Sequence, residues 1–309
     1  MLKFILKRIL ISVPVLIGVA LVLFLLLNVV PGDPVTLMMR EHIKPNLIAA
    51  FRERMRLDDP VLIRFGRYML NVLRGDFGVS YKDQREVSDL IAMAFPHTLK
   101  LTLYSVLVSW IIGIPSGIAA AVKQNTFIDR AFMGFSLMGV SLPVFWAGLL
   151  AQFVFAYKLA WLPTTGYYSF KYYIMPSVVL GWNSAGTVAR LTRSNLLESL
   201  RNDFIRTARA KGLSESAVVV GHALKNALIP VVTVMALQIA SLLGGAVMTE
   251  SVFGIPGLGR IAVKAISDRD MPMLQGTVLF TTAIVIAGNL VADVMYAFLD
   301  PRIRVDGAR

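Results

Sequence analysis

Long apolar runs separated by short polar segments dominate this chain. About 20 mostly apolar residues are needed for a helix to cross a bilayer, and a run of that length is typical of a transmembrane helix. The pattern predicts an all-α integral membrane protein with six transmembrane helices. These are expected at Ile9–Val30, Leu99–Val122, Ala131–Tyr157, Ile174–Ala189, Leu228–Thr249 and Gly276–Phe298.

The fourth predicted span is the weakest, because small and polar residues interrupt it between Gly181 and Gly186. Such residues suit close helix packing or a water-lined face better than contact with lipid. The N-terminal run differs from a signal peptide, since Ile9–Val30 is longer than an ordinary signal core and no small-residue cleavage site follows. We interpret it as an uncleaved first span.

Lys and Arg in the short loops set the expected orientation. They gather on the side that holds both termini, chiefly between Arg190 and Lys225, so both termini are expected in the cytoplasm. The long segment Pro31–Thr98 is then external. Its apolar residues from Leu57 to Leu73 recur at roughly helical spacing, which predicts a small folded subdomain. We expect it to receive a partner through Arg52, Arg56 and Arg64, or else to serve only as a structural cap.

A basic hairpin is expected between Asp203 and Pro230. Phe204–Lys211 holds good helix formers, Gly212 interrupts them, and Ser214 can cap a second helix that runs through Asn226. Small and basic residues suit docking to another protein, whereas an amphipathic helix on anionic lipid is the alternative. The residues alone leave both open.

Composition excludes several classes of function. Hydrophobic residues make up 56% of the 309, and charged residues only 16%, against about 25% in soluble domains. There is no cysteine, the three histidines lie far apart in sequence, and no phosphate-binding loop, H-E-x-x-H or G-x-S-x-G motif occurs. A metal site, covalent catalysis and an intrinsic nucleotide site are therefore not expected. The net charge of +12 fits membrane topology and anionic lipid rather than nucleic acid.

One acidic residue, Asp293, lies within the last predicted span. Asp293 follows Asn289 by four residues, so both lie on the same helical face. An ion-coupling site would suit a stand-alone secondary transporter, whereas an interhelical hydrogen bond or access to water at the helix end needs no transport role. Polar residues of spans three to five are the candidates to line a path, with helix packing as the alternative for each: Gln152, Asn183, Ser184, Thr187, Gln238 and Ser241.

The hairpin resembles the cytoplasmic coupling loop of inner-membrane permeases of binding-protein-dependent ABC importers. With the motif glycine placed at Gly212, Ala208 and Leu224 also match, and the other motif positions differ. The variant form "RTARAKGL" followed by "HALKNALIPVVT" is similar to the dipeptide, oligopeptide and nickel permease branch. "PGDPV", "GDFGVS", "GVSLPVFWAGLL", "ESVFGIPGLGR" and "DPRIR" agree in order, so the resemblance covers essentially the whole chain and is greatest to the first permease of the pair.

This resemblance implies a type I ABC importer permease fold in the cell inner membrane, with a long external loop after the first helix. The expected organisation is a first helix (1–30), an external subdomain (31–98), a permease core (99–298) with the coupling loop at 203–230, and a cytoplasmic tail (299–309). The resemblance further implies an ATPase-coupling role for the hairpin. The residues concerned are Arg206, Thr207, Ala208, Arg209, Gly212 and Leu224.

The implied function is import of dipeptides or short oligopeptides, and the alternatives within the branch are nickel chelates, glutathione or oligosaccharides. The implied partners are a second homologous permease, two ATP-binding cassette ATPases, an extracytoplasmic substrate-binding protein and membrane lipid. The chain itself is expected to bind no cofactor, because the partner ATPases would use the ATP and Mg²⁺.

Overall fold

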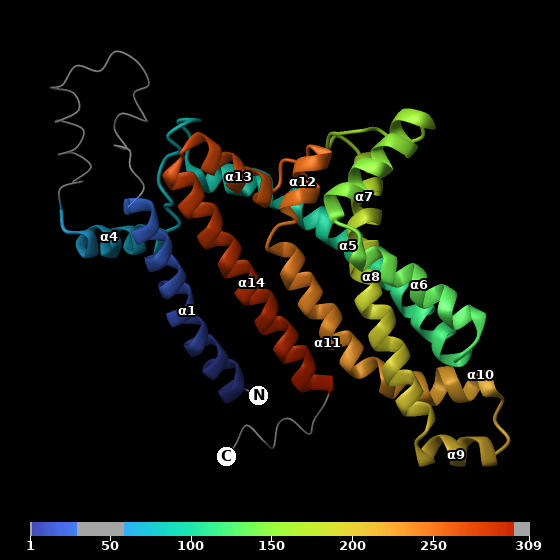
Figure 1. Cartoon of the computed structure of the whole chain (residues 1–309). Coiled ribbons are helices and arrows are strands. Elements are labelled where there is room, and N and C mark those ends of the chain that lie inside the picture. The colour runs from blue at the N-terminus through green and yellow to red at the C-terminus, as the bar shows by residue number, and fades with distance from the viewer. Residues whose placement is uncertain (1, 30–58, 300–309) are drawn as a thin grey trace.

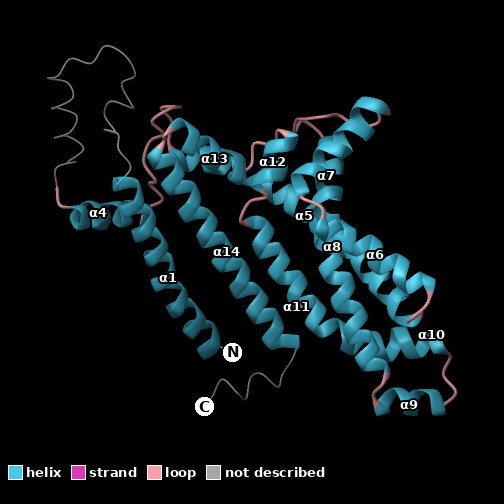
Figure 2. Ribbon diagram, viewed as in Figure 1, coloured by secondary structure: helices cyan, strands magenta, loops and turns pink. Residues whose placement is uncertain are grey.

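A computed structural model describes residues 2–29 and 59–299, and these form helices joined by loops (Figures 1 and 2). Within that part the only β pairing is an isolated bridge between Val79 and Glu86. The α-helices are α1 (Leu2–Val29), α4 (Val61–Leu73), α5 (Val87–Val122), α6 (Phe127–Ser141), α7 (Val144–Ala151), α8 (Lys171–Leu200), α9 (Asp203–Ala210), α10 (Glu215–Ala217), α11 (Leu224–Leu243), α12 (Val247–Phe253), α13 (Leu258–Asp268) and α14 (Met271–Leu299). Two π-helical turns, η1 (Gln152–Lys158) and η2 (Val218–Ala223), continue α7 and α10.

The all-helical prediction is confirmed. Four helices are long and apolar enough to cross a membrane: Ile5–Leu26, Val87–Val122, Glu215–Leu243 and Met271–Met295. A fifth candidate is a bent pair of helices. α8, which contains the predicted fourth span, is 30 residues long but fails the hydropathy test within the described ranges, as its small and polar residues would suggest.

The predicted third span, Ala131–Tyr157, is not one continuous helix. Phe127–Ser141 and Val144–Lys158 meet at an angle of 103°. The break falls at Leu142–Pro143, where Leu142 takes an extended conformation. Proline has no backbone N–H to donate and disfavours a helical residue before it, so the sequence "SLP" ends the first helix. The prediction of one span rested on the continuous apolar run and did not consider this local signal.

Close helix packing explains the small residues of α5 and α8, the pair in most extensive contact. A Cβ added to Gly117 would lie 2.6 Å from the Ala189 carbonyl oxygen, and one added to Gly181 would lie 2.6 Å from the Ser105 carbonyl oxygen. These glycines let the two backbones approach more closely than any side chain would permit. The Gly181–Gly186 stretch was expected either to pack closely against another helix or to line a water-filled face. Close packing accounts for its glycines.

The segment predicted to be external is described from residue 59 onward, and there it contains α4, a turn region with the Val79–Glu86 bridge, and the start of α5. α4 covers Val61–Leu73 as its spacing predicted, and Phe65 packs edge-on against Phe24 of α1 with ring centroids 5.5 Å apart. α5 begins at Val87, so the second long helix starts inside the segment predicted to be external. Leu57, Arg52 and Arg56 lie outside the described residues.

α1 stands at the edge of the helix bundle against α14 (Figure 1). Arg8 of α1 forms an ion pair with Asp293 of α14 across 3.1 Å. The acid that raised the possibility of ion coupling therefore has a basic partner in the neighbouring helix. A paired acid stabilises helix association and needs no coupling ion.

Candidate functional site

The hairpin consists of α9, a short turn and α10, which continues through η2 into α11. Gly212 in the turn has φ +79°, a left-handed conformation that disfavours side chains. Its amide donates to the Arg209 carbonyl oxygen at 2.9 Å, which closes α9. The Ser214 hydroxyl accepts from the Ala217 amide at 3.4 Å and caps the next helix as predicted. The sequence therefore fixes both the end of one helix and the start of the next.

The inner face of α9 packs on the chain itself. Ile205 is fully buried and Ala208 is 5% exposed, in a cluster that includes Leu196, Val218 and Ala223. We had expected Ala208 to allow a partner protein to approach closely. In the described chain its methyl group instead faces inward, so its small size lets α9 lie against η2.

The outer face of α9 carries the predicted polar residues. Arg209 donates to both Glu215 oxygens, at 3.1 Å from Nε and 2.6 Å from Nη2, and these bonds raise the pKa of the Arg209 guanidinium. Arg206 lies 3.4 Å from Asp203, and the Thr207 hydroxyl donates to the Asp203 carbonyl oxygen at 3.1 Å. The Arg209–Glu215 pair bridges the two helices across the glycine turn.

Exposed apolar side chains interrupt this polar surface. Phe204 is 40% exposed, Leu213 41% and Val220 59%. The prediction missed these residues, although apolar side chains in an otherwise polar hairpin are the available sequence signal. Exposed apolar residues surrounded by charges are typical of a protein-docking surface. We call Phe204, Leu213 and Val220 the apolar face of the hairpin.

The hairpin is tied to two long helices. The Ser199 hydroxyl, near the end of α8, donates to the Ala223 carbonyl oxygen at 3.0 Å in a buried position. That carbonyl lies at the end of η2, where a π-helical turn departs from the regular α-helical pattern. Leu224 then begins α11. A force on the hairpin would therefore reach α8 and α11 directly.

The hairpin lies at the same end of the bundle as the start of α1 and the last turn of α14 (Figure 1). α12, α13 and the start of α5 lie at the opposite end. The hairpin, the start of α1 and the end of α14 therefore share one side of the bundle, and the cytoplasmic orientation of that side stays a prediction.

The six candidate path residues fall into two groups. Three side chains bind backbone of other segments: Gln152 donates to the Thr164 and Val252 carbonyl oxygens, Asn183 to that of Gly139, and Gln238 to that of Ser184. These hydrogen bonds join separate segments, so they explain the three polar side chains without a role in lining a path. Thr187 and Ser241 are exposed in the chain, on α8 and α11. The structure therefore brings Ser184 and Gln238 together and leaves Thr187 and Ser241 as the accessible candidates.

A buried carboxylate at the opposite end was not among the predicted site residues. Glu250 is fully buried, accepts from the Thr98 hydroxyl at 2.7 Å and from the Arg260 amide at 2.9 Å, and lies against Gly257. It caps the first turn of α13. The signal available in the sequence was the glycine-rich "ESVFGIPGLGR", since glycine is required where a backbone approaches another group closely.

Arg64 is the one expected partner-binding arginine among the described residues. Its guanidinium lies 5.9 Å from the ring centroid of Phe24, so it packs on α1 while remaining partly exposed. Across residues 2–29 and 59–299, no group of three or more His, Asp or Glu could hold a metal ion.

Two family profiles match the amino-acid sequence of this chain. The profile described as "Binding-protein-dependent transport system inner membrane component" matches residues 113–305. A second, described as "Binding-prot-dependent transport system membrane comp, N-term", matches residues 1–102. Together they cover both the segment predicted to be external and the hairpin.

Full-length relatives are similar along the whole chain. The glutathione transport system permease protein GsiC of Salmonella paratyphi A is 45% identical over 304 residues, which is 98% of this chain and 99% of the relative. GsiC of Escherichia coli K12 is 43% identical over the same length. The dipeptide transport system permease protein DppB of Alkalihalophilus pseudofirmus is 39% identical over 332 residues, 98% of this chain and all of the relative.

Solved structures share the fold. An inward-facing structure of the MetNI methionine ABC transporter matches with a TM-score of 0.59 at 19% identity, over 68% of this chain and 96% of the other. An amino acid ABC transporter crystallised with histidines matches with a TM-score of 0.54 at 16% identity, over 70% and 94%. At this identity the likeness shows the type I permease fold alone.

Proposed function

Because this chain belongs to the family of inner membrane components of binding-protein-dependent transport systems, we propose that it lines, with a second homologous permease, an import path for dipeptides or short oligopeptides. The chain is a multi-pass inner-membrane permease subunit of an ABC importer. It is a transport subunit and has no ATPase site of its own.

The partners follow from this membership. Two ATP-binding cassette ATPases supply the energy and bind the ATP and Mg²⁺, and an extracytoplasmic substrate-binding protein delivers the substrate. The six hairpin residues Arg206, Thr207, Ala208, Arg209, Gly212 and Leu224 belong to the ATPase-coupling element. In support of this role, Arg206 and Arg209 are exposed on the outer face of α9, whereas Ala208 and Gly212 shape the hairpin.

The observation that carries this proposal is the hairpin itself. It combines an ion pair between its helices, the apolar face and a buried hydrogen bond to α8. A loop that lay on lipid would need no rigid attachment to two spanning helices. A loop that transmits movement from an ATPase needs that attachment, because coupling travels through packed and hydrogen-bonded elements.

The names of the relatives point to two substrates, dipeptides and glutathione. A relative that is 39% identical is named a dipeptide permease, and one that is 45% identical is named a glutathione permease. Glutathione is itself a tripeptide, so both names fit a path for short peptides. Nickel chelates and oligosaccharides have no comparable support among these relatives.

The test is uptake by the complete importer in proteoliposomes, with its own binding protein outside and ATP inside. We expect ATP-dependent accumulation of radiolabelled dialanine or of glutathione, unaffected by ionophores that collapse ion gradients. Uptake by this chain alone, driven by an ion gradient, would instead support a secondary transporter. The Arg8–Asp293 ion pair argues against that result, because it already neutralises the intramembrane acid.

A further inference from the structure

A cavity of about 430 Å³ opens between the turn that precedes α5 and the outer surface of α13, at the end of the bundle opposite the hairpin. Binding sites for small molecules commonly measure roughly 300–1,000 Å³. Its walls include Leu90, Met93, Ala94, Ile261 and Ala265, of which the two alanines are almost fully buried. Charged side chains of both signs surround this apolar floor: Lys82, Asp83, Arg85, Lys264, Asp268 and Asp270.

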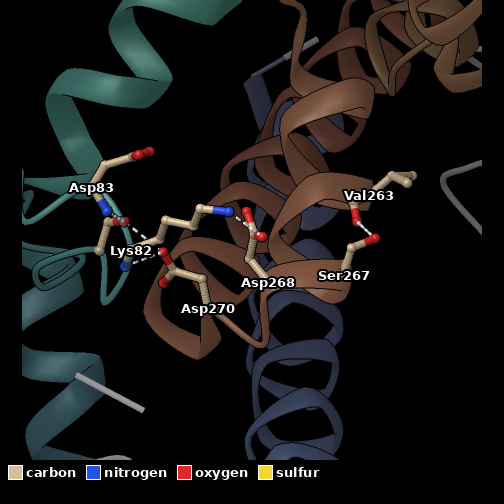
Figure 3. Close-up of polar contacts among 7 residues, drawn as sticks. Lys82, Asp83, Val263, Ser267, Asp268 and Asp270 are labelled. Atoms are coloured by element: carbon tan, nitrogen blue, oxygen red, sulfur yellow. Dashed lines mark hydrogen bonds and ion pairs between the residues drawn. The ribbon is translucent and has the colours of Figure 1, made fainter. Parts of the chain in front are cut away.

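Internal contacts fix one side of the cavity. The buried Asp270 accepts from the Ser80 hydroxyl at 2.5 Å and from the Lys82 amide at 3.2 Å, so it clamps the turn onto the start of α14. Lys82 also forms an ion pair with Asp268 (Figure 3). Lys82, Asp268 and Asp270 are therefore occupied by structural contacts, and the wall that they form is held in place.

The remaining charges have no ionic partner among the described residues. The Arg85 guanidinium donates to the Met93 sulfur at 3.3 Å, and neither Arg85 nor Lys264 forms an ion pair within residues 2–29 and 59–299. The Asp83 carboxylate stands apart from the Lys82–Asp268 pair (Figure 3). Charge-assisted hydrogen bonds are strong when they form, so these three groups offer binding energy for a ligand that carries the opposite charges.

We propose that this cavity binds a short peptide with free ends, Arg85 and Lys264 holding its carboxylate, Asp83 its ammonium group and the apolar floor a side chain. The two basic groups and one acidic group complement a ligand that has at least one carboxylate and one amine. A phosphate or an anionic lipid headgroup would leave Asp83 opposed to like charge. A loop of the binding protein would lack the free carboxylate and ammonium ends of a short peptide.

This inference rests on the proposed function, because the proposed function puts the cavity on the external side of the membrane. If the cavity binds peptide, the permease itself contacts the substrate. The permease then contributes to substrate selectivity in addition to the binding protein. The inference can fail while the proposed function stands, because an importer could transport peptides without this contact.

Photolabelling of the complete importer tests the site. The probe is alanyl-p-benzoylphenylalanine, a dipeptide with a photoreactive apolar side chain, applied without binding protein. We expect label on Leu90, Met93 or Ala265, reduced by excess Ala-Phe but not by N-acetyl-Ala-Phe amide. The double variant Arg85→Gln/Lys264→Gln should lower labelling about tenfold, since each lost charge-assisted bond weakens binding.

Lys171→Gln is the matched control, because Lys171 is another exposed basic residue outside the cavity. It should label as the unaltered chain does. Co-purification of the ATPases confirms that each variant is assembled. Label elsewhere, equal labelling in the double variant, or competition by the blocked peptide would overturn the proposal.

Discussion

The Thr98 hydroxyl donates a hydrogen bond of 2.7 Å to Glu250, which lies 152 residues further along the chain. The same hydroxyl accepts from the Leu258 amide at 2.8 Å, and Glu250 accepts from the Arg260 amide at 2.9 Å. One threonine of α5 and one buried carboxylate of α12 thus satisfy the amides at the start of α13. These bonds attach α13 to the long helix α5 and hold one wall of the cavity proposed to bind a peptide.

Gly257→Ala should destabilise this junction. An added Cβ would overlap the Glu250 carboxylate, which is fixed by its hydrogen bonds and is unable to move aside. Overpacking of this kind typically costs about 1–3 kcal/mol, so the detergent-solubilised complex should unfold at lower temperature. Gly66→Ala is the control, because a Cβ at Gly66 meets nothing within 4 Å. Equal melting temperatures for the two variants would contradict the assigned role of Glu250.

The Arg209–Glu215 pair should matter for coupling rather than for folding. Both side chains are exposed, and exposed ion pairs contribute little to stability. Arg209→Glu alone places two acids together at the turn and should reduce ATP-driven uptake severalfold. Adding Glu215→Arg restores opposite charges and should recover part of that loss.

A double-variant cycle separates the two roles of Arg209. If the ATPase binds the Arg209 guanidinium directly, the double variant Arg209→Glu/Glu215→Arg should remain as defective as Arg209→Glu alone. Partial recovery would show that the bridge between the helices is what matters. Arg206→Glu is the matched comparison, since Arg206 faces the same surface and has only the weaker 3.4 Å contact to Asp203.

Single cysteines should distinguish the accessible from the hydrogen-bonded positions among four of the candidate path residues. The chain has no native cysteine, so each substitution gives one reactive thiol. Thr187→Cys and Ser241→Cys should react with membrane-impermeant maleimide during turnover, because both positions are exposed in the chain. Gln152→Cys and Asn183→Cys should react slowly and lower stability, because each loses hydrogen bonds to another segment. Rapid labelling of the second pair alone would reverse the assignment.

The external arginines should affect the binding protein. Reversal of charge at Arg52, Arg56 and Arg64 together should reduce ATPase stimulation by the binding protein at low salt and spare basal activity. The difference should shrink as salt rises, because exposed charges are screened. Arg64→Glu also removes the contact over Phe24, so Arg64→Gln serves as its uncharged control. Equal stimulation at every salt concentration would leave only a structural cap.

Much of the architecture was predictable because local signals and tertiary structure agree. Gly212 adopts the left-handed conformation that its place between two helices indicated, and Ser214 caps the helix that follows. The apolar runs at Ile9–Val30 and Gly276–Phe298 overlap α1 and α14 closely. In each case the chemistry that decides the structure lies within a few neighbouring residues.

The remainder depends on contacts between distant segments. Ala208 was expected to face a partner, but its burial depends on Leu196 and Val218, whose positions the hairpin sequence alone does not specify. Glu250 looked like one acid in a turn-rich segment, and its function as a helix cap requires Thr98 far upstream. The break at Pro143 had a local signal, which hydropathy averaged over a long window conceals.

The central claim is that the hairpin docks on the partner ATPases. Its apolar face offers the most direct test, because Leu213 is exposed and its replacement should leave the chain folded. Leu213→Glu places a charge where a partner would bury it. Burial of an unpaired charge is costly, so binding should weaken strongly. Gly212→Pro is the companion variant, since proline removes the amide that donates to Arg209 and cannot adopt φ +79°.

The decisive measurement is the amount of ATPase that co-purifies with the inserted permease. Gly221→Ala is the control, because a Cβ at that hairpin glycine meets nothing within 4 Å. We predict that Gly221→Ala retains the ATPases, whereas Leu213→Glu and Gly212→Pro lose most of them while the second permease stays bound. Full retention of the ATPases by both altered hairpins would contradict the account.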